Sequence, residues 1–233
     1  DRSPSRGLGD VYKRQIFQMS LLGATLEKIA VEIRNLQRTE IAEVSEHFKK
    51  GQMGSSAVPT KRNPIKSERI SSLSKLLRSQ INISFENIPL WHERDLSNSA
   101  NERFILPMTS ILLDEMIETM TRIIENLQVN TKRVQENLHI TRGQIFAEFV
   151  LEALIKKGVP RFEAYRDVQR VAFDAHKKEI DYLDAIKNDK LISANLSDKE
   201  IESIFVPEKH LGASLGIIDN VFNHVKANAK KFS

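Results

Sequence analysis

The stretch that decides the fold is residues 19–36, MSLLGATLEKIAVEIRNL. Its large apolar side chains recur at alternating steps of three and four residues, at Met19, Leu22, Leu26, Ile29, Ile33 and Leu36. An α-helix has 3.6 residues per turn, so this spacing places all of them on one face. The stretch predicts a long amphipathic helix whose apolar seam packs in a helical bundle.

Two further long helices are predicted downstream. The first follows Asn63-Pro64, which predicts a helix cap with proline at the first helical position. The second opens at Ser99, where Ser99 and Glu102 have the spacing of a capping box, and carries an apolar face over residues 113–127. Shorter helices are predicted at residues 141–157, 161–179, 198–205 and 214–229.

The predicted fold class is all-α. No segment shows the strict alternation of a β-strand, and no repeat with a period of about 20–50 residues is present. We expect a partial central helical-bundle domain in residues 16–138, followed by a smaller all-α C-terminal domain in residues 139–233. Three long helices with wide apolar faces rarely close a core alone, so further chain or other subunits should cover them.

The composition excludes several classes of protein. With 40% hydrophobic and 28% charged residues, the 233-residue chain resembles an ordinary globular protein. No stretch approaches the roughly 18 consecutive apolar residues of a membrane span, so we expect no membrane partner and a cytoplasmic location. The absence of cysteine excludes disulfides and cysteine-based metal or nucleophile sites. Interspersed charges do not favour nucleic-acid binding, and small anionic substrates remain open.

The first fifteen residues, DRSPSRGLGDVYKRQ, do not share the helical pattern. Their Arg, Gly and Pro content is typical of a disordered N-terminus, and they lack the apolar core of a targeting peptide. Residues 10–15 also match the translation of GAT GTG TAT AAG AGA CAG, which resembles a transposase adaptor end used in preparing sequencing libraries. We interpret residues 1–15 as a non-native segment joined to an incomplete reading frame.

Residues 51–64, GQMGSSAVPTKRNP, form the most informative loop. One interpretation is a flexible connector, since Gly and Ser are common in linkers. The loop is nevertheless long for a connection between bundled helices. It places Ser, Lys and Asn just before a helix N-terminus, where free N–H groups favour an anion. Its glycines would let it close over a ligand.

A second group of candidate residues consists of Arg94, Ser99 and Arg103. One interpretation is solvated charge around a loop. As a set they fit a monophosphate site, because two guanidiniums bind phosphate oxygens well and Ser99 would cap a helix whose free N–H groups favour an anion.

The ungapped run from Gly54 to Glu68 resembles the signature of the fumarase/aspartase superfamily, homotetrameric α-helical lyases that release fumarate by β-elimination. Within it, Lys61-Arg62-Asn63-Pro64 is similar to the adenylosuccinate lyase and 3-carboxymuconate cycloisomerase families. Three further segments resemble the first of these two families: residues 91–103, 141–148 and 158–165. The resemblance covers about residues 16–233.

The resemblance implies a role for each residue of the loop. Ser55 would be the general base that removes the proton next to a carboxylate, and Ser56 would contact substrate. A serine is a very poor base unless its oxyanion is stabilised, which Lys61 and the adjoining helix would do. Lys61 and Asn63 would also hold the succinyl carboxylates. Glu68 would fix the tautomer of a histidine from another subunit, which protonates the leaving nitrogen.

The phosphate set distinguishes the two families, because a cycloisomerase acting on a tricarboxylate has no phosphate for Arg94, Ser99 and Arg103 to bind. Val58 and Thr60 stand where the family more usually has methionine and histidine. These departures bear on substrate contacts rather than on the reaction class.

The resemblance implies an enzyme that cleaves adenylosuccinate to AMP and fumarate, and also its carboxamide ribotide analogue in purine biosynthesis, without metal or organic cofactor. It implies a nucleotide substrate and a homotetramer. The open alternatives are 3-carboxymuconate cycloisomerase or another lyase of the superfamily, and a non-catalytic helical assembly protein. The six histidines match no family motif, so we interpret them as surface or packing residues and expect the isolated chain to be an inactive fragment.

Overall fold

The computed structural model describes residues 8–48, 51, 58, 60–92 and 95–229. The chain divides into two compact units between Val134 and Gln135, whereas the sequence placed the division at residue 138. α4 (Thr131–Leu138) spans this division. Each unit is described by itself.

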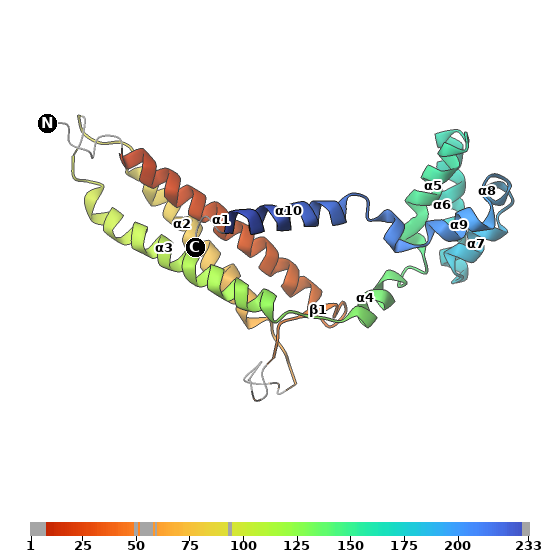
Figure 1. The fold of residues 1–233 in the computed structure, drawn as a ribbon, viewed down its shortest axis with the longest axis horizontal. Coiled ribbons are helices and arrows are strands. Elements are labelled where there is room, and N and C mark those ends of the chain that lie inside the picture. Colours follow the sequence, from red (N-terminus) through yellow and green to blue (C-terminus); the bar gives the residue numbers. More distant parts are fainter. Residues whose placement is uncertain (1–7, 49–50, 52–57, 59, 93–94, 230–233) are drawn as a thin grey trace. The chain divides into compact units, whose positions relative to one another are not determined.

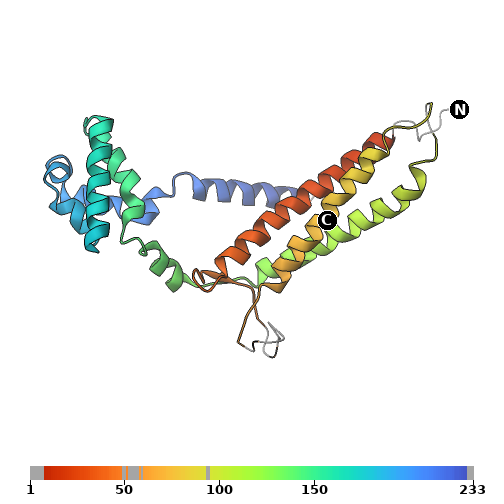
Figure 2. The ribbon, with the colours of Figure 1, turned by 180° about the vertical axis from the view of Figure 1, so that it is seen from behind.

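The first unit is built on three long antiparallel helices that lie side by side in Figures 1 and 2. These are α1 (Leu8–Leu36), α2 (Ile65–Glu86) and α3 (Ser99–Glu125). Their shared core contains Ala30, Ile33, Ile70, Leu77, Leu113, Met116, Met120 and Ile123. The all-α prediction is therefore confirmed in the described part of the chain, and no helix there is long and apolar enough to cross a membrane.

The predicted seam of the first helix is wrong in two respects. α1 begins at Leu8, well before Met19, and two predicted seam residues are exposed, Leu22 by 44% and Ile29 by 40%. Ile33 of the predicted seam is buried, and Met19 and Leu26 pack against the core. The rest of the buried face runs through Ile16, Ser20, Gly23 and Ala30. The inner face is rich in small residues because α2 lies too close for large ones.

The contact between α1 and α2 shows how close the two backbones are. A Cβ atom on Gly23 would lie 2.3 Å from Leu77 Cδ2. Ser20 Oγ donates to the carbonyl oxygen of Leu77 at 3.3 Å, and Ser74 Oγ donates to that of Gly23 at 3.2 Å. Each serine hydroxyl donates its hydrogen bond to a backbone carbonyl oxygen of the facing helix. α1 and α2 are therefore joined by hydrogen bonds as well as by apolar packing.

A two-residue antiparallel ribbon, which the sequence did not predict, joins the ends of α1 and α3. β1 (Val44–Ser45) pairs with β2 (Gln128–Val129), with Val44 opposite Val129. Two residues per strand are too few to produce an alternating pattern. Arg133 holds the same junction by donating Nε to the carbonyl oxygen of Ile41 at 3.1 Å. The ribbon fixes the chain that leads into the loop before α2.

At the opposite end of the bundle, Asn87 and Asn101 exchange two amide hydrogen bonds of 2.7 and 2.8 Å. Asn87 is buried at the C-terminus of α2, and Asn101 belongs to the first turn of α3. The pair fixes the start of α3 against the end of α2.

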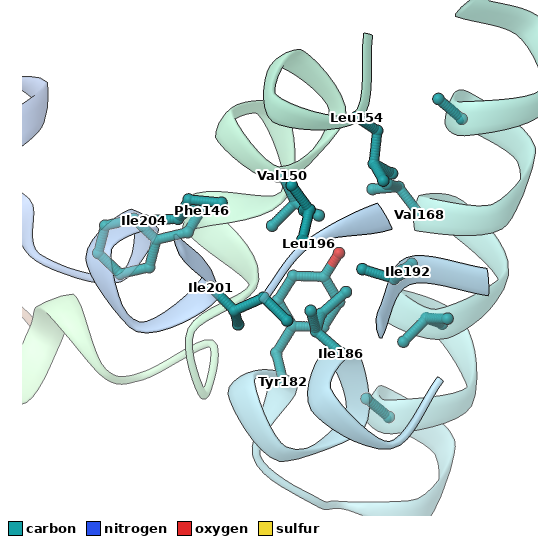
Figure 3. Packing of buried hydrophobic residues seen from close by; sticks show 13 residues of the cluster. Phe146, Val150, Leu154, Val168, Tyr182, Ile186, Ile192, Leu196, Ile201 and Ile204 are labelled. Atoms are coloured by element: carbon teal, nitrogen blue, oxygen red, sulfur yellow. The ribbon is translucent and has the colours of Figure 1, made fainter. Parts of the chain in front are cut away.

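The second unit is a cluster of short helices around one apolar core. The cluster consists of η1 (Gln144–Phe146), α5 (Ala147–Lys156), α6 (Arg161–Lys178), α7 (Tyr182–Asn188), α8 (Lys190–Asn195), α9 (Asp198–Ile204) and η2 (Pro207–His210). The unit also includes α10 (Ser214–Ala229), which buries no residue and takes no part in this core. Figure 3 shows the Tyr182 ring in the middle of this core. A capping box of Ser197 and Glu200 is present at the start of α9.

The sequence did not anticipate α7 and α8. Each is capped by an aspartate, Asp181 for α7 and Asp189 for α8, whose carboxylate accepts backbone N–H groups of the first turn. Helices of six and seven residues are too short for a periodic apolar face, so only their caps signal them.

Candidate functional site

An open cleft of about 1230 Å³ lies where α1 ends and α2 begins. Its walls come from the last turn of α1, the β1–β2 ribbon, residue 58 and residues 60–64. Among the described residues, its charged lining consists of four cations and one carboxylate: Arg34, Arg38, Lys61, Arg62 and Glu68. A cleft lined mainly by positive charge raises the local concentration of small anions.

Three of the predicted site residues meet in this cleft. Lys61 and Glu68 are exposed on its wall, and Asn63 is half-buried between them in the chain. The two positions that depart from the family pattern, Val58 and Thr60, line the same cleft. Ser55, Ser56 and Arg94 lie outside the described residues.

The N-terminus of α2 is not open to a ligand, contrary to the prediction. Buried Glu46 accepts the backbone N–H of Ser67 at 2.7 Å, its hydroxyl also at 2.7 Å, and the N–H of Lys66 at 3.2 Å. The N–H groups of Ile65 and Glu68 bond to the carbonyl oxygens of Asn63 and Pro64. A carboxylate of the chain itself thus occupies the place expected for a substrate anion.

The predicted cap of α2 is therefore corrected as well. Pro64 occupies the cap position instead of being the first helical residue, and no side-chain hydrogen bond from that position caps the helix. Glu46 takes over this role from 21 positions away in the sequence. No local sequence pattern marks a cap that comes from so far along the chain.

Gln37 ties this cap to the loop. Its Oε1 accepts the backbone N–H of Glu46 at 2.9 Å, and its Nε2 donates to the carbonyl oxygen of Arg62 at 3.0 Å. One side chain at the end of α1 thus fixes both the residue that caps α2 and the residue that follows Lys61. Sequence reasoning missed Gln37, Glu46, Arg34 and Arg38, since nothing in their local pattern indicates a cleft.

Ser99 and Arg103 do not lie in this cleft. They belong to the first turns of α3, which begin beside the C-terminus of α2, while Lys61 and Asn63 precede its N-terminus. α2 has 22 residues, so the two groups are separated by about 33 Å along the bundle. Figure 1 shows the two ends.

The predicted capping by Ser99 is wrong. Ser99 is the first residue of α3, and Asn98 occupies the cap position with helical backbone angles and no side-chain bond to the helix backbone. The Nδ2 of Asn98 donates to Glu102 Oε1 at 3.0 Å instead. The cap moves by one residue because the turn before it continues directly into the helix, with Ser99 N–H bonded to the carbonyl oxygen of Leu96.

The segment before Ser99 is organised by Asp95. Its carboxylate accepts the Ser97 hydroxyl at 2.5 Å, the Trp91 N–H at 2.6 Å and the Ser97 N–H at 2.8 Å. The hydrogen bond from the Ser97 hydroxyl, with those from the two backbone N–H groups, lowers the pKa of Asp95. This turn precedes the helix that carries Arg103.

No group of three or more His, Cys, Asp or Glu side chains in the described ranges is arranged to hold a metal ion. The described histidines lie in packing or surface positions, and His210 stacks on Phe149 with ring centroids 3.5 Å apart.

Each of the two units of the chain contains a segment that matches a known family model. Residues 9–76 match the lyase family model, and residues 143–221 match the model of the adenylosuccinate lyase C-terminus. The adenylosuccinate lyases of Pyrococcus abyssi and Pyrococcus horikoshii are each 41% identical to the chain over 217 residues, which is 93% of the chain. The chain spans about half of their length, 48% in each case.

Solved structures share the fold. The 3-carboxy-cis,cis-muconate lactonizing enzyme of Pseudomonas putida has a TM-score of 0.79 and 25% identity, over 91% of this chain and 47% of that one. A fumarate lyase from Mesorhizobium sp. BNC1 has the same TM-score at 22% identity, over 92% of this chain and 47% of that one, and shows the fold alone.

The three-helix unit and the match to the lyase family model place the chain in the fumarase/aspartase superfamily. Within this superfamily the chain belongs to the adenylosuccinate lyase family.

Proposed function

We propose that the enzyme containing this chain cleaves adenylosuccinate to AMP and fumarate, and also the succinyl-carboxamide ribotide analogue, by β-elimination. The observation that carries the proposal is the basic cleft that brings Lys61, Asn63 and Glu68 together. The family of the chain supports the assignment of a succinylated purine nucleotide as substrate. A homotetramer and a cytoplasmic location belong to the same proposal.

The reaction removes a proton from the carbon next to a carboxylate, breaks the C–N bond and returns a proton to the leaving nitrogen. In the proposal Ser55 takes the first proton and Ser56 contacts the substrate. Lys61 and Asn63 hold the succinyl carboxylates, where negative charge develops as the proton leaves. Glu68 orients a histidine of another subunit, which protonates the nitrogen.

Arg94, Ser99 and Arg103 bind the monophosphate in this proposal. Because the described members of this set lie about 33 Å along α2 from Lys61, one chain cannot supply both groups to one substrate. The proposal therefore requires active sites built between subunits, with the cleft of one chain facing the start of α3 of another.

The test is to assay fumarate release from adenylosuccinate with the enzyme that contains this chain. Ser55→Ala should abolish turnover while substrate still binds, since general-base catalysis contributes about 10²–10⁴-fold. Retention of more than about a tenth of kcat would reject Ser55 as the base.

Assembly between subunits is tested by mixing two inactive variants. Lys61→Gln and Arg103→Ala remove the two separated groups, so mixed tetramers contain some sites in which both groups are intact. Activity in the mixture but in neither variant alone is the expected result. Equal inactivity of the mixture, with mixed tetramers demonstrated, would contradict the shared site.

The likeness to a 3-carboxymuconate enzyme favours one second candidate, a lactonizing activity on a tricarboxylate. Arg103→Ala distinguishes the lactonizing activity from cleavage of adenylosuccinate, because a tricarboxylate has no phosphate for Arg103 to bind. The variant should weaken AMP binding much more than fumarate binding. Turnover of 3-carboxymuconate that is unaffected by Arg103→Ala would favour the second candidate.

A further inference from the structure

Arg34 is a half-buried guanidinium in the last turn of α1, on the wall of the cleft. Its Nη1 donates to Ser71 Oγ at 3.1 Å. Within the described part of the chain it has no carboxylate partner. Charged side chains that are partly shielded from water are normally paired with an opposite charge. Arg34 is therefore available to bind an anion that enters the cleft.

Arg38 follows four residues later, in the turn after α1, and lines the same cleft. Its guanidinium makes no hydrogen bond or ion pair with the described residues. Both side chains line the cleft at the end of α1, so the two guanidiniums share one wall. Gln37, between them, is bonded to Arg62 and so places this wall beside the loop that carries Lys61.

Among the described residues, the first turn of α2 offers an anion no free backbone N–H group. Glu46 and nearby carbonyl oxygens already take the N–H groups of the first turn of α2. An anion that enters the cleft must therefore be bound by side-chain cations. A guanidinium presents its N–H donors in a planar fork that matches the two oxygens of a carboxylate.

We propose that Arg34 and Arg38 form a carboxylate subsite in the cleft, which takes one end of a small dicarboxylate such as fumarate while Lys61 takes the other. This inference rests on the proposed function, because it assigns two further binding residues to the same cleft. Both are binding residues that touch the anion and do not transfer protons.

The test is titration of the full chain with fumarate at low ionic strength, followed by calorimetry or by NMR of backbone amides. Inorganic phosphate and acetate are the comparison anions. Arg38→Gln and Arg34→Gln should each weaken fumarate binding about tenfold, the factor that corresponds to about 1.4 kcal/mol for a lost charge-assisted contact. Fumarate should bind more tightly than acetate, which has only one carboxylate.

Arg14→Gln is the matched control, since it removes the same charge from the same helix about 30 Å from Arg34. It should change the Kd less than about twofold, because exposed charges at that distance are screened. Ser71→Ala removes the hydrogen-bond partner of Arg34 and keeps its charge, so binding should persist. If Arg34→Gln does not fold by circular dichroism, Arg38→Gln decides, because the Arg38 side chain is exposed and makes no hydrogen bond or ion pair with the described residues.

Three results would overturn the subsite: no saturable fumarate binding to the folded wild-type chain, unchanged affinity in Arg38→Gln, or tighter binding of phosphate than of fumarate. If Lys61→Gln abolishes fumarate binding while Arg34→Gln and Arg38→Gln do not weaken it, the proposed function stands and the subsite is refuted. Fumarate binding that depends on both arginines, in an enzyme that does not cleave adenylosuccinate, would refute the proposed function and leave the subsite intact.

Discussion

The carboxylate of Glu46 accepts both the backbone N–H and the hydroxyl of Ser67 at 2.7 Å, and so closes the N-terminus of α2 from within the chain. Glu46 is only 5% exposed, which makes the pair a fixed part of the first unit. The helix dipole that would otherwise attract a substrate anion is neutralised before any ligand arrives. In the proposed function, Lys61 and Asn63 would therefore meet their ligand through side chains, at a junction whose geometry is set by Glu46.

Replacement of Glu46 by alanine should destabilise the chain by about 2 kcal/mol, near the upper end for loss of a helix cap, because the N–H groups of Lys66 and Ser67 lose their buried acceptor. Urea unfolding measures the loss, and amide hydrogen exchange at Lys66 and Ser67 should accelerate. Added acetate should restore part of the stability of the variant by occupying the vacated place, with little effect on the wild type.

Glu32→Ala is the control for this prediction, since it removes the same charge from an exposed position near the C-terminal end of α1. Its effect should stay within about 0.5 kcal/mol. A loss of similar size in both variants, or no response of Glu46→Ala to acetate, would mean that Glu46 does not act as the cap.

Gly23→Ala should destabilise the first unit by about 1–3 kcal/mol, because the new Cβ would lie 2.3 Å from Leu77 Cδ2 and push α1 away from α2. The matched control is Gly216→Ala in α10, where no atom lies within 4 Å of the new Cβ. That change should stabilise α10 by up to about 1 kcal/mol, the difference in helix propensity. Thermal melts should show a lower Tm for Gly23→Ala and no lowering of the Tm for Gly216→Ala. A higher Tm in Gly23→Ala would exclude the close contact.

The sequence was a good guide to the long helices and a poor guide to their contacts. Steps of three and four residues between large apolar side chains locate α1, α2 and α3, because a helix in a bundle needs such a face. The pattern nevertheless emphasises Leu22 and Ile29, while Ser20 and Gly23 make the close contact with α2. Small residues carry no hydrophobic signal, so periodicity cannot show where two helices approach most closely.

The candidate site likewise contains some residues that the sequence predicts and others that only the structure shows. Lys61, Asn63 and Glu68 were found because they lie in one ungapped motif, and the structure brings them into one cleft. Arg34 and Arg38 line that cleft from the last turn of α1 and the turn after it. Glu46 caps α2 directly after the β1–β2 ribbon, which joins residues more than eighty positions apart. Such contacts depend on tertiary structure, and a single sequence without relatives does not contain them.

The ion pair of Lys157 and Glu200, 2.6 Å between Nζ and Oε1, should make the second unit sensitive to acid. The hydrogen bond from Lys157, with those from Ser197, lowers the pKa of Glu200 from 4.5 to about 2. Because the pKa is lower in the folded state, the stabilisation is present above about pH 4.5 and is lost as the pH falls toward 2. The difference in Tm between the wild type and Glu200→Gln should therefore be constant from pH 7 to 5 and shrink below that range.

Glu152→Gln provides the comparison, since it breaks the exposed pair with Lys156 one helical turn away, at 3.5 Å. Surface pairs of this kind contribute little, so its Tm should stay near that of the wild type at every pH. A difference for Glu200→Gln that grows as the pH falls would reverse the sign of the linkage and refute the assignment.

Tyr182→Phe should stabilise the second unit by about 1 kcal/mol, because the Tyr182 hydroxyl is buried in the described core without a hydrogen-bond partner. Figure 3 shows it among apolar side chains that would surround a phenylalanine ring equally well.

Burial raises the pKa of Tyr182 above its ordinary value of 10.0, so the folded state holds the proton more tightly than the unfolded state. The wild type should therefore lose stability as the pH rises above about 10, and Tyr182→Phe should lose less. Urea unfolding at pH 8 and pH 10.5 measures both effects, with Tyr165→Phe, whose residue is 54% exposed, as the control. A loss of more than about 1 kcal/mol in Tyr182→Phe at pH 8 would show that the hydroxyl makes a favourable hydrogen bond in solution, and the prediction would be wrong.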